Sequence, residues 1–466
     1  MRSCRIERGN GIPVEVLKKL TAAIISLFSL IPLGQPLVVG TSSLLASSAL
    51  MLVVTKEAKS EDAKYYFIRG VEKYSAGNYS GAIADFTKAI EINPTLSKLY
   101  ESRGQIKGQN LNDYSGAIAD YTKAIEIDPM SELAYTSRGQ IKAEHLKDYS
   151  GAIIDYDKAI EINPDYVLPY YNRGVTKGML GDSYGAISDY NRAIEINPDF
   201  AFAYFNRGSE RAKLKDHLGA ISDYTKAIEF DPNFAGAYNN RGEQKAKLDD
   251  YSGAIADYDK ATEIAPNKIN PYYNRGMAKV KLEDFAGALA DYDKAIEINP
   301  GDANVYYSRG LIKGHLEDYS GAIYDLNKVI AIKPNNGDAY YARGKAKGKL
   351  DDYSGALADY DKAIEINPDD ALAYYARGLI KGNYLKDYSG ALADNSKLIE
   401  INPQDATAYF NRSVAKKNLR DFSGARIDYE KAIKLNPKLA DVQKDSTWYS
   451  NRGIIRFLRG LIRGIR

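Results

Sequence analysis

The hydrophobic and polar positions of this chain repeat with a period of 34 or 35 residues. An arginine recurs at the same place in every copy, and glycine nearly always follows it. Eleven copies run from about Ala63 to Leu439. A fixed period of this length is the signature of one small structural unit copied many times. The arginines stand at positions 69, 103, 138, 173, 207, 241, 275, 309, 343, 377 and 412.

Each copy predicts two helices joined by a turn. The copy from Tyr170 to Phe200 reads YYNRGVTKGMLGDSYGAISDYNRAIEINPDF. Its first helix contains the Tyr-Arg-Gly segment, and a break that contains glycine and aspartate precedes the second helix. The second helix, from Tyr184 to Ile196, places Ala186, Tyr190 and Ala193 on one face. An Asn-Pro pair then ends it, because proline lacks an N–H donor and restricts the residue before it.

Neither helix can bury its apolar face alone, so neighbouring copies must stack and share a core. This predicts an all-α solenoid, a superhelix of helix-turn-helix units over residues 63–439. The spacing of six residues resembles that of the tetratricopeptide repeat family: Tyr170, Gly174, Ala186, Tyr190, Ala193 and Pro198. The resemblance covers about four-fifths of the chain and implies a right-handed superhelix of about eleven repeats. The low divergence among the copies is similar to that of arrays in cyanobacterial and other bacterial proteins.

The recurring arginine stands where the family usually has leucine. An aspartate follows each arginine by about sixteen residues, and a lysine or arginine follows it by four, as Lys177 follows Arg173. We predict a ladder of bidentate Arg-Asp pairs between first and second helices. The alternative is a stack of cations that binds anions. A matched acid at every arginine favours internal neutralisation.

The family resemblance also implies where a ligand would bind. In tetratricopeptide repeats the concave groove is lined by the first helices, chiefly at the residues one and two before the arginine place and two after it. Asparagine offers a donor and an acceptor to a peptide backbone, and tyrosine offers rigid amphipathic area. The alternative is that the aromatic residues only pack between helices. The predicted groove residues are Phe67, Tyr171, Asn172, Phe205, Asn206, Asn240, Tyr273, Asn274, Tyr307, Tyr341, Tyr375, Phe410 and Asn411.

Composition and charge exclude several classes of function. The formal net charge of +2 conceals two basic ends and a mildly acidic repeat region, which argues against a nucleic-acid-binding face. His145, His217 and His315 lie in different repeats, and Cys4 is the only cysteine, so no catalytic or metal-binding cluster can form from them. We therefore expect a non-enzymatic protein with no cofactor and no metal.

The N-terminus predicts a membrane or export segment. Residues 1–19 form a basic segment, and the 36 residues from Leu20 to Thr55 carry no charge. Three interpretations compete: a signal-peptide core at Leu20–Leu33, a single span at Pro36–Val54, or a hairpin of both. We favour an uncleaved anchor. By the positive-inside rule a single span places the solenoid on the non-cytoplasmic side, in a periplasm or lumen, whereas a hairpin places it in the cytoplasm.

The C-terminal residues 440–466 carry a first-helix signature without a second helix after it. Tyr449-Ser450-Asn451-Arg452-Gly453 repeats the first-helix pattern. From Arg452 to Arg466, arginines recur every three or four residues opposite apolar side chains, which predicts a basic amphipathic helix. Such a helix would either cap the solenoid or contact a membrane.

These features together favour a membrane-associated scaffold or adaptor whose concave groove binds a peptide or protein segment. The alternative is a structural array that associates with itself. No residue identifies the partner or its pathway.

Overall fold

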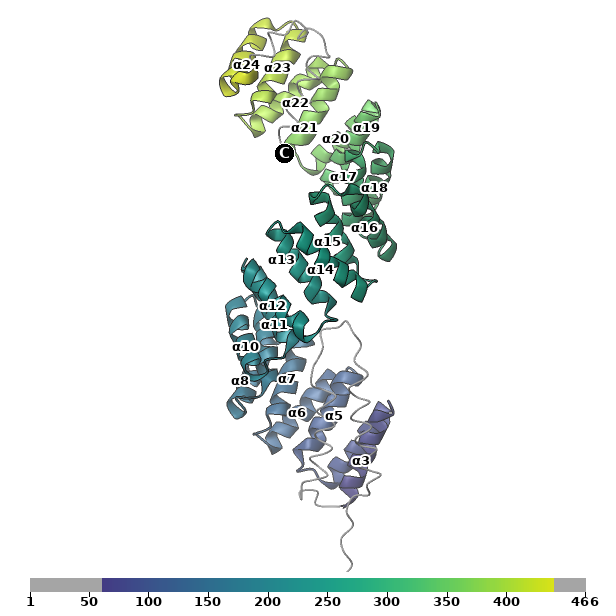
Figure 1. The fold of residues 1–466 in the computed structure, drawn as a ribbon, viewed down its shortest axis with the longest axis vertical. Helices are drawn as coiled ribbons and strands as arrows, with labels where there is room; N and C mark the ends of the chain where they lie inside the picture. Colours follow the sequence, from purple (N-terminus) through teal and green to yellow (C-terminus); the bar gives the residue numbers. More distant parts are fainter. Residues whose placement is uncertain (1–60, 440–466) are drawn as a thin grey trace, which may run out of the picture. The chain divides into compact units, whose positions relative to one another are not determined.

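The computed structural model describes residues 61–439, and this part of the chain is helical from end to end, without strands (Figure 1). The predicted all-α solenoid of tetratricopeptide-like repeats is confirmed. The N-terminal anchor and the C-terminal amphipathic helix both lie outside the described residues. Within residues 61–439, no helix is both long and apolar enough to cross a membrane.

First and second helices alternate along the chain. The first helices are α3 (Glu61–Ser75), α5 (Ser97–Asn110), α7 (Glu132–Glu144), α9 (Val167–Met179), α11 (Ala201–Lys213), α13 (Ala235–Lys247), α15 (Ile269–Lys281), α17 (Ala303–His315), α19 (Gly337–Lys349), α21 (Ala371–Leu379) with its π-helical extension η1 (Ile380–Tyr384), and α23 (Ala406–Asn418). The second helices are α4 (Tyr79–Ile92), α6 (Tyr114–Ile127), α8 (Tyr149–Ile162), α10 (Ser183–Ile196), α12 (His217–Phe230), α14 (Tyr251–Ile264), α16 (Phe285–Ile298), α18 (Tyr319–Ile332), α20 (Tyr353–Ile366), α22 (Tyr388–Ile401) and α24 (Phe422–Leu435).

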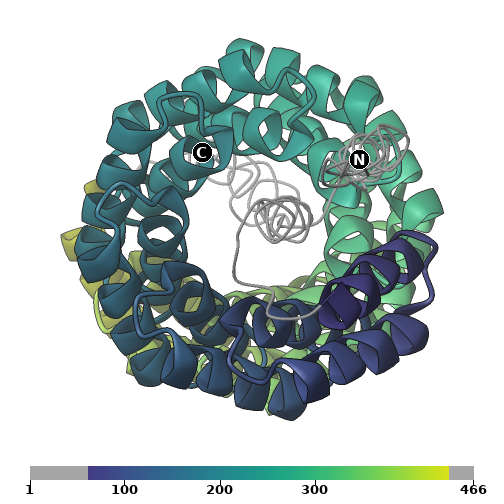
Figure 2. The same ribbon diagram turned by 90° about the horizontal axis from the view of Figure 1, so that it is seen from below.

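The helices fall into two compact units, which divide after Leu248. The first unit holds five hairpins, from α3/α4 to α11/α12, followed by α13. The second begins with α14 and continues with five hairpins, from α15/α16 to α23/α24. Inside each unit every helix packs on the next, and first helices also touch the first helix of the next hairpin, as α7 touches α9 and α17 touches α19. The helices therefore form two layers (Figure 2).

An aspartate caps the start of every second helix except α4. In α4, the N-cap residue is Asn78. Asp182 accepts a hydrogen bond from the backbone N–H of Gly185 at 2.9 Å, so α10 begins at Ser183, one residue before the predicted start. A Cβ at Gly185 would lie 2.1 Å from a carboxylate oxygen of Asp182, which explains why glycine stands there. The preceding Gly181 has a φ of 83°, a conformation that suits the tight turn. The predicted end of α10 is confirmed, with Asn197 as its C-cap.

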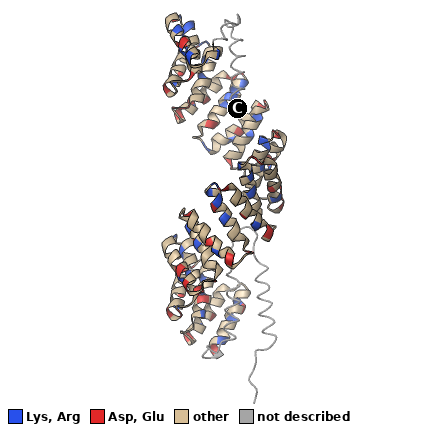
Figure 3. Ribbon diagram, turned by 60° about the vertical axis from the view of Figure 1, so that its left-hand side comes forward, with Lys and Arg blue, Asp and Glu red and all other residues tan. Residues whose placement is uncertain are grey.

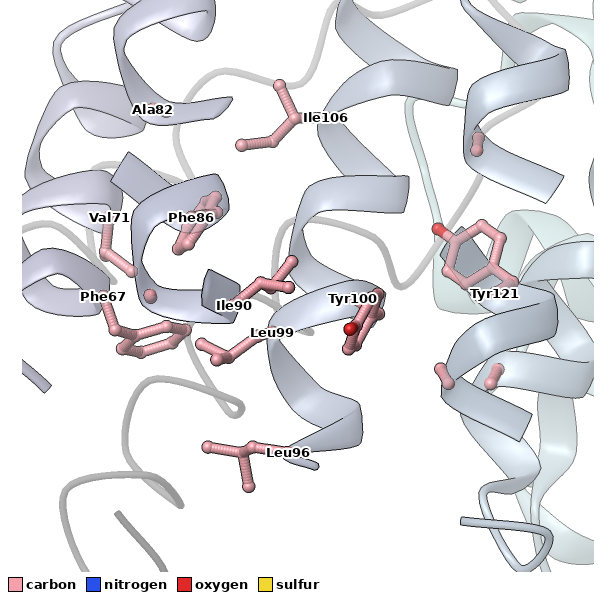
Figure 4. Packing of buried hydrophobic residues seen from close by; sticks show 14 of the residues in the cluster. Phe67, Val71, Ala82, Phe86, Ile90, Leu96, Leu99, Tyr100, Ile106 and Tyr121 are labelled. Carbon is pink, nitrogen blue, oxygen red and sulfur yellow. The ribbon is translucent and has the colours of Figure 1, made fainter. Parts of the chain in front are cut away.

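The core of most hairpins contains a glycine of the first helix packed on an aromatic ring of the second, whereas Gly310 packs near Leu326. A Cβ at Gly174 would lie 2.8 Å from the ring of Tyr190, so only glycine lets the two helices approach this closely. Tyr190, Ala186 and Ala193 are buried, as the helical spacing predicts. Figure 4 shows how the cluster is built in the first hairpins, where Phe86 lies among side chains of neighbouring helices. Burying one such side chain contributes about 1.5–3 kcal/mol.

Candidate protein-binding face

The predicted Arg-Asp ladder is present in both units. In the hairpin α17/α18, Arg309 donates from Nε and Nη2 to the two carboxylate oxygens of Asp325, at 2.9 and 2.6 Å. The Asp325 side chain is fully buried, and the Arg309 side chain is 12% exposed. The structure places ten of the ladder arginines on their aspartates: Arg69–Asp85, Arg103–Asp120, Arg138–Asp155, Arg173–Asp189, Arg207–Asp223, Arg275–Asp291, Arg309–Asp325, Arg343–Asp359, Arg377–Asp394 and Arg412–Asp428.

A second cation completes each of these pairs. The lysine four residues after the arginine, Lys313 in α17, lies 2.9 Å from the same carboxylate. The pattern holds in all ten described pairs, with Arg211 in place of the lysine in α11. In the first hairpin, the hydrogen bond from Arg69, together with Lys73 and against the effect of burial, lowers the pKa of Asp85 to about 2. Each of these carboxylates therefore lies between two cationic side chains.

Every ladder arginine from Arg103 to Arg412 also reaches back to the preceding repeat, a contact that the sequence analysis missed. Arg309 donates from Nη1 to Asp293 on α16 at 2.5 Å, and Arg103 donates to Thr87 on α4 at 3.0 Å. The signal was present in the sequence, because the residue two places after each ladder aspartate from Asp85 to Asp394 is a short polar one. The acceptors are Thr87, Thr122, Asp157, Asn191, Thr225, Asp259, Asp293, Asn327, Asp361 and Ser396.

The guanidinium groups also lie over a tyrosine ring. Arg309 Cζ is 5.6 Å from the ring centroid of Tyr306, three residues earlier on the same helix. The same pairing recurs from Arg69 with Tyr66 to Arg412 with Tyr409. The arginine thus contacts its own second helix, the preceding second helix and its own first helix. These contacts make it a structural joint between repeats and remove the basis for a stack of anion-binding cations.

Three of the predicted groove residues lie in the core. Phe67 and Phe410 are 1% exposed and Tyr171 is 8% exposed. These side chains are buried by the residue 29 positions further along the chain. For Phe67 and Tyr171 this residue is the N-cap of the next first helix, and for Phe410 it is Leu439, after α24. It is apolar in these three cases and packs in the same cluster: Leu96 for Phe67, Phe200 for Tyr171 and Leu439 for Phe410.

The other five aromatic residues are half-buried. Tyr273 packs one side of its ring on Tyr292 at 5.9 Å, and Tyr341 packs in the same way on Tyr360. Polar N-cap residues, such as Asp302 and Asp370, follow these two by 29 positions and leave the ring edges open. For these two residues one side of the ring supports the hairpin, and part of the ring stays exposed. Phe205 is half-buried although Phe234, 29 positions ahead, packs on it at 4.6 Å. The five are Phe205, Tyr273, Tyr307, Tyr341 and Tyr375.

Burial raises the pKa of three of the open tyrosines. Burial, with the charge of Asp405, raises the pKa of Tyr375 to about 12, and burial also raises the pKa of Tyr307 and Tyr341. At neutral pH each hydroxyl is an uncharged donor and acceptor.

The predicted asparagines, which directly precede the arginines, are half-buried and partly engaged with neighbours. Asn206 donates from Nδ2 to the hydroxyl of Tyr171 at 2.9 Å, and Asn240 is hydrogen-bonded to Tyr224. These two side chains brace adjacent repeats. Asn172, Asn274 and Asn411 occupy the same position in α9, α15 and α23.

Two exposed apolar side chains extend the aromatic positions of the second unit. Met277 on α15 and Leu311 on α17 stand two residues after the ladder arginine and are 41% and 44% exposed. Lys345 is exposed at the same place on α19 and forms no ion pair with another described residue. We call Tyr273, Met277, Tyr307, Leu311, Tyr341 and Tyr375 the tyrosine strip. Among the described residues, basic and acidic residues are interspersed in each unit (Figure 3).

The described residues offer no candidate metal site. Between residues 61 and 439, no group of three or more His, Cys, Asp or Glu side chains is arranged to hold an ion.

Comparison with known families agrees with this helical-repeat architecture. Sequence models described as tetratricopeptide repeat match residues 63–96, 97–129, 169–200, 203–234, 235–268, 269–302 and 406–439. A model described as TPR repeat matches residues 146–181, 315–351 and 349–383. These matches cover more than half of the chain. The protein belongs to the tetratricopeptide repeat family, whose repeats form scaffolds for protein–protein interaction.

Several solved structures are similar to parts of the chain. YrrB, described as a TPR protein with an unusual peptide-binding site, is 28% identical, covers 40% of this chain and 97% of its own, and has a TM-score of 0.37. The C-terminal part of a TPR repeat-containing protein from Cytophaga hutchinsonii is 19% identical over 52% of this chain and 98% of its own, with a TM-score of 0.46. The hetero-tetramer Cut9-Hcn1 of the APC/C is 14% identical over 85% of this chain and 98% of its own, with a TM-score of 0.41. No curated protein matches the chain.

Proposed function

We propose that this protein is a non-enzymatic adaptor that binds an extended segment of a partner protein along the tyrosine strip. The observation that carries the proposal is the recurrence of half-buried tyrosines on four consecutive first helices, α15, α17, α19 and α21. The rings of Tyr273 and Tyr341 each pack on a tyrosine of their own hairpin, so they present apolar area at a small cost in side-chain entropy. Rings of this kind are favoured anchors in protein interfaces.

The spacing of the strip defines the ligand. Packed helices lie about 8–10 Å apart, and an extended chain advances about 3.3 Å per residue. One first helix therefore matches every third residue of an extended segment. Met277 and Leu311 stand beside two of the tyrosines and favour apolar side chains at those places. We expect a partner segment with an apolar residue at every third position.

A pair of surface substitutions tests the proposal without disturbing the core. Leu311→Asp places a charge on the tyrosine strip, whereas Tyr324→Asp places one on the second helix α18, where Tyr324 is also exposed. Affinity purification of the full chain, followed by binding assays with each recovered partner, should show partners lost from the first variant and kept by the second. Equal binding by both variants would remove the tyrosine strip as the site.

The same experiment tests the structural alternative. If the protein is recovered alone and light scattering finds oligomers in both variants, the chain is a self-associating array rather than an adaptor.

We further propose that residues 20–55 tether the protein to a membrane and that the solenoid lies on the non-cytoplasmic side. The uncharged stretch and the basic residues before it support this orientation. Protease treatment of intact membrane vesicles tests it. Digestion of the solenoid only in vesicles that expose the cytosolic face would establish the hairpin topology instead.

A further inference from the structure

The turn inside most hairpins exposes a leucine, which is the C-cap residue of the first helix. In the second unit, Leu282, Leu316 and Leu350 occupy this place on three consecutive hairpins and are 48%, 47% and 49% exposed. Single exposed apolar side chains are common on protein surfaces, but these three recur at the same place on neighbouring hairpins. We call them the leucine edge. A half-buried aromatic residue follows each leucine by three positions and widens the apolar row: Phe285, Tyr319 and Tyr353.

Acidic side chains flank the leucine edge. The two residues after each leucine are acidic and exposed, whereas the residue before it is lysine in the first and third turns and histidine in the second. The edge therefore combines regularly spaced apolar area with net negative charge. A surface of this sign repels anionic lipid and nucleic acid and attracts basic partners. The acidic residues are Glu283, Asp284, Glu317, Asp318, Asp351 and Asp352.

One acid of each turn stands where the backbone favours glycine. Glu283, Glu317 and Asp351 have φ values of 59°, 65° and 62°. A side chain costs about 1 kcal/mol in this conformation, and Gly181 in the first unit shows that the turn accepts glycine. The side chains of Glu283 and Glu317 form no hydrogen bond or ion pair with another described residue. Their charge therefore serves no visible purpose inside the hairpin.

The next two turns of the same unit keep the leucine but change the charge. Leu385 is 47% exposed and Leu419 is 42% exposed. The residues that follow them are Lys386 and Arg420, which adopt the same left-handed conformation. The leucines thus continue past the point where the acidic pairs end, so the effects of the leucine and of the charge can be measured separately.

The backbone of these turns is already hydrogen-bonded. The N–H of Glu283 donates to the carbonyl of Val280, and the N–H of Asp284 donates to the carbonyl of Lys279. The edge therefore offers a partner mainly side chains. An extended segment would need other acceptors and donors for its own backbone, whereas an α-helix satisfies its backbone internally.

We infer that the leucine edge binds a basic amphipathic α-helix of a partner protein. Packed helices lie about 8–10 Å apart, and seven residues of an α-helix advance about 10 Å. A helix with apolar residues repeated every seven positions thus places one at each turn, and lysines or arginines beside them meet the acidic pairs. About 15–20 residues cover three turns. None of these residues belongs to the tyrosine strip, so this site and the proposed function can fail separately.

Designed peptides of about 20 residues test the inference. The first has leucine at positions a and d of each heptad and lysine at e and g. The second has glutamate in place of the lysines, and the third has alanine in place of the leucines. Each peptide carries a fluorophore and is used at nanomolar concentration, and its anisotropy is measured with the full chain in nanodiscs of neutral lipid, with empty nanodiscs as the blank. We expect the first peptide to bind and the other two to bind at least about tenfold more weakly.

Surface substitutions locate the binding. Leu316→Ser should weaken binding of the lysine peptide about tenfold, whereas Leu385→Ser, which removes an equally exposed leucine beside Lys386, should not. Glu317→Lys should weaken binding of the lysine peptide and strengthen binding of the glutamate peptide, a reversal that a folding defect cannot produce. Leu311→Asp, on the tyrosine strip, should leave binding of the lysine peptide unchanged.

Four results would overturn the inference. The first is equal binding of the lysine and glutamate peptides, and the second is an equal loss of binding in the Leu316 and Leu385 variants. The third is no binding of the lysine peptide above the blank. The fourth is a dimer of the unmodified chain that Leu316→Ser dissociates, because the leucine edge would then belong to a second copy.

Discussion

Replacing Asp325 by asparagine removes the carboxylate that Arg309 and Lys313 share. The new side chain has nearly the same shape but no charge, and it accepts at one oxygen where the carboxylate accepts at two. Asp325 is fully buried, so water cannot take over the lost interactions. The two cations would then lie in the hairpin with no anion between them.

The loss of stability depends on which contacts Arg309 and Lys313 keep in the variant. Breaking a buried ion pair by removing one partner costs about 3–5 kcal/mol. Arg309 retains its contact with Asp293 at 2.5 Å and its position over Tyr306. The Lys313 side chain is 21% exposed and can turn toward solvent. We therefore expect the lower end of the range, about 3 kcal/mol.

Amide hydrogen exchange in α17 and α18 is the suitable assay, because a long repeat array need not unfold in one step. A loss of about 3 kcal/mol corresponds to local opening that is more than a hundredfold more frequent, since each 1.4 kcal/mol is tenfold. Asp293→Asn is the matched control. It removes another carboxylate from the same arginine, but Asp293 is exposed, so the cost should be at most about 1 kcal/mol.

The reasoning fails if the two variants accelerate exchange to the same extent. It also fails if Asp325→Asn affects the distant hairpins of the second unit as strongly as α17 and α18, because the contacts of Asp325 are local.

Three further predictions concern a glycine, a cap and a pH dependence. Gly276→Ala should destabilise α15/α16 by about 1–3 kcal/mol, because its Cβ would lie 2.7 Å from the ring of Tyr292. Gly310→Ala should cost less, because its Cβ would lie 3.3 Å from the Cβ of Asp325 and 3.4 Å from Leu326; equal thermal denaturation of both variants would contradict this. Asp216→Ala removes the N-cap of α12 and should cost about 1 kcal/mol, visible as faster exchange in its first turn; unchanged exchange would argue against the cap. The pKa of Asp85 is lowered from 3.8 to about 2, so its contribution to α3/α4 is present above about pH 4 and is lost as the pH falls through about 2. An exchange titration should show this loss, and the Asp85→Asn variant should lack it.

The ladder could be predicted from the sequence because both partners belong to the same repeat. Each arginine and its aspartate keep a nearly constant separation along the chain, and the helical period turns both toward the shared interface. The backward contact to residues such as Thr87 was equally regular. It was missed because the acceptor is threonine, aspartate, asparagine or serine in different repeats. These residue types share only the ability to accept a hydrogen bond.

The burial of the aromatic residues predicted for the groove could not be predicted from the first helix alone. Tyr171 and Tyr341 occupy the same position, yet one is buried and the other is partly open. The difference comes from the start of the next first helix, where Phe200 covers Tyr171 and Asp370 leaves Tyr341 open. Burial in a stacked array is decided by two repeats together, so a residue must be compared with its partner 29 positions ahead.

The arginine that joins neighbouring repeats has a consequence for the length of the protein. Because its two acceptors lie at nearly fixed distances before and after it, removing residues 276–309 would join Arg275 directly to Gly310. Arg275 would keep Asp259 behind it and would find Asp325 ahead at the usual distance. Recombination between copies of the repeat could therefore remove or add whole repeats. In the product, the arginine at every repeat junction would still reach both of its acceptors.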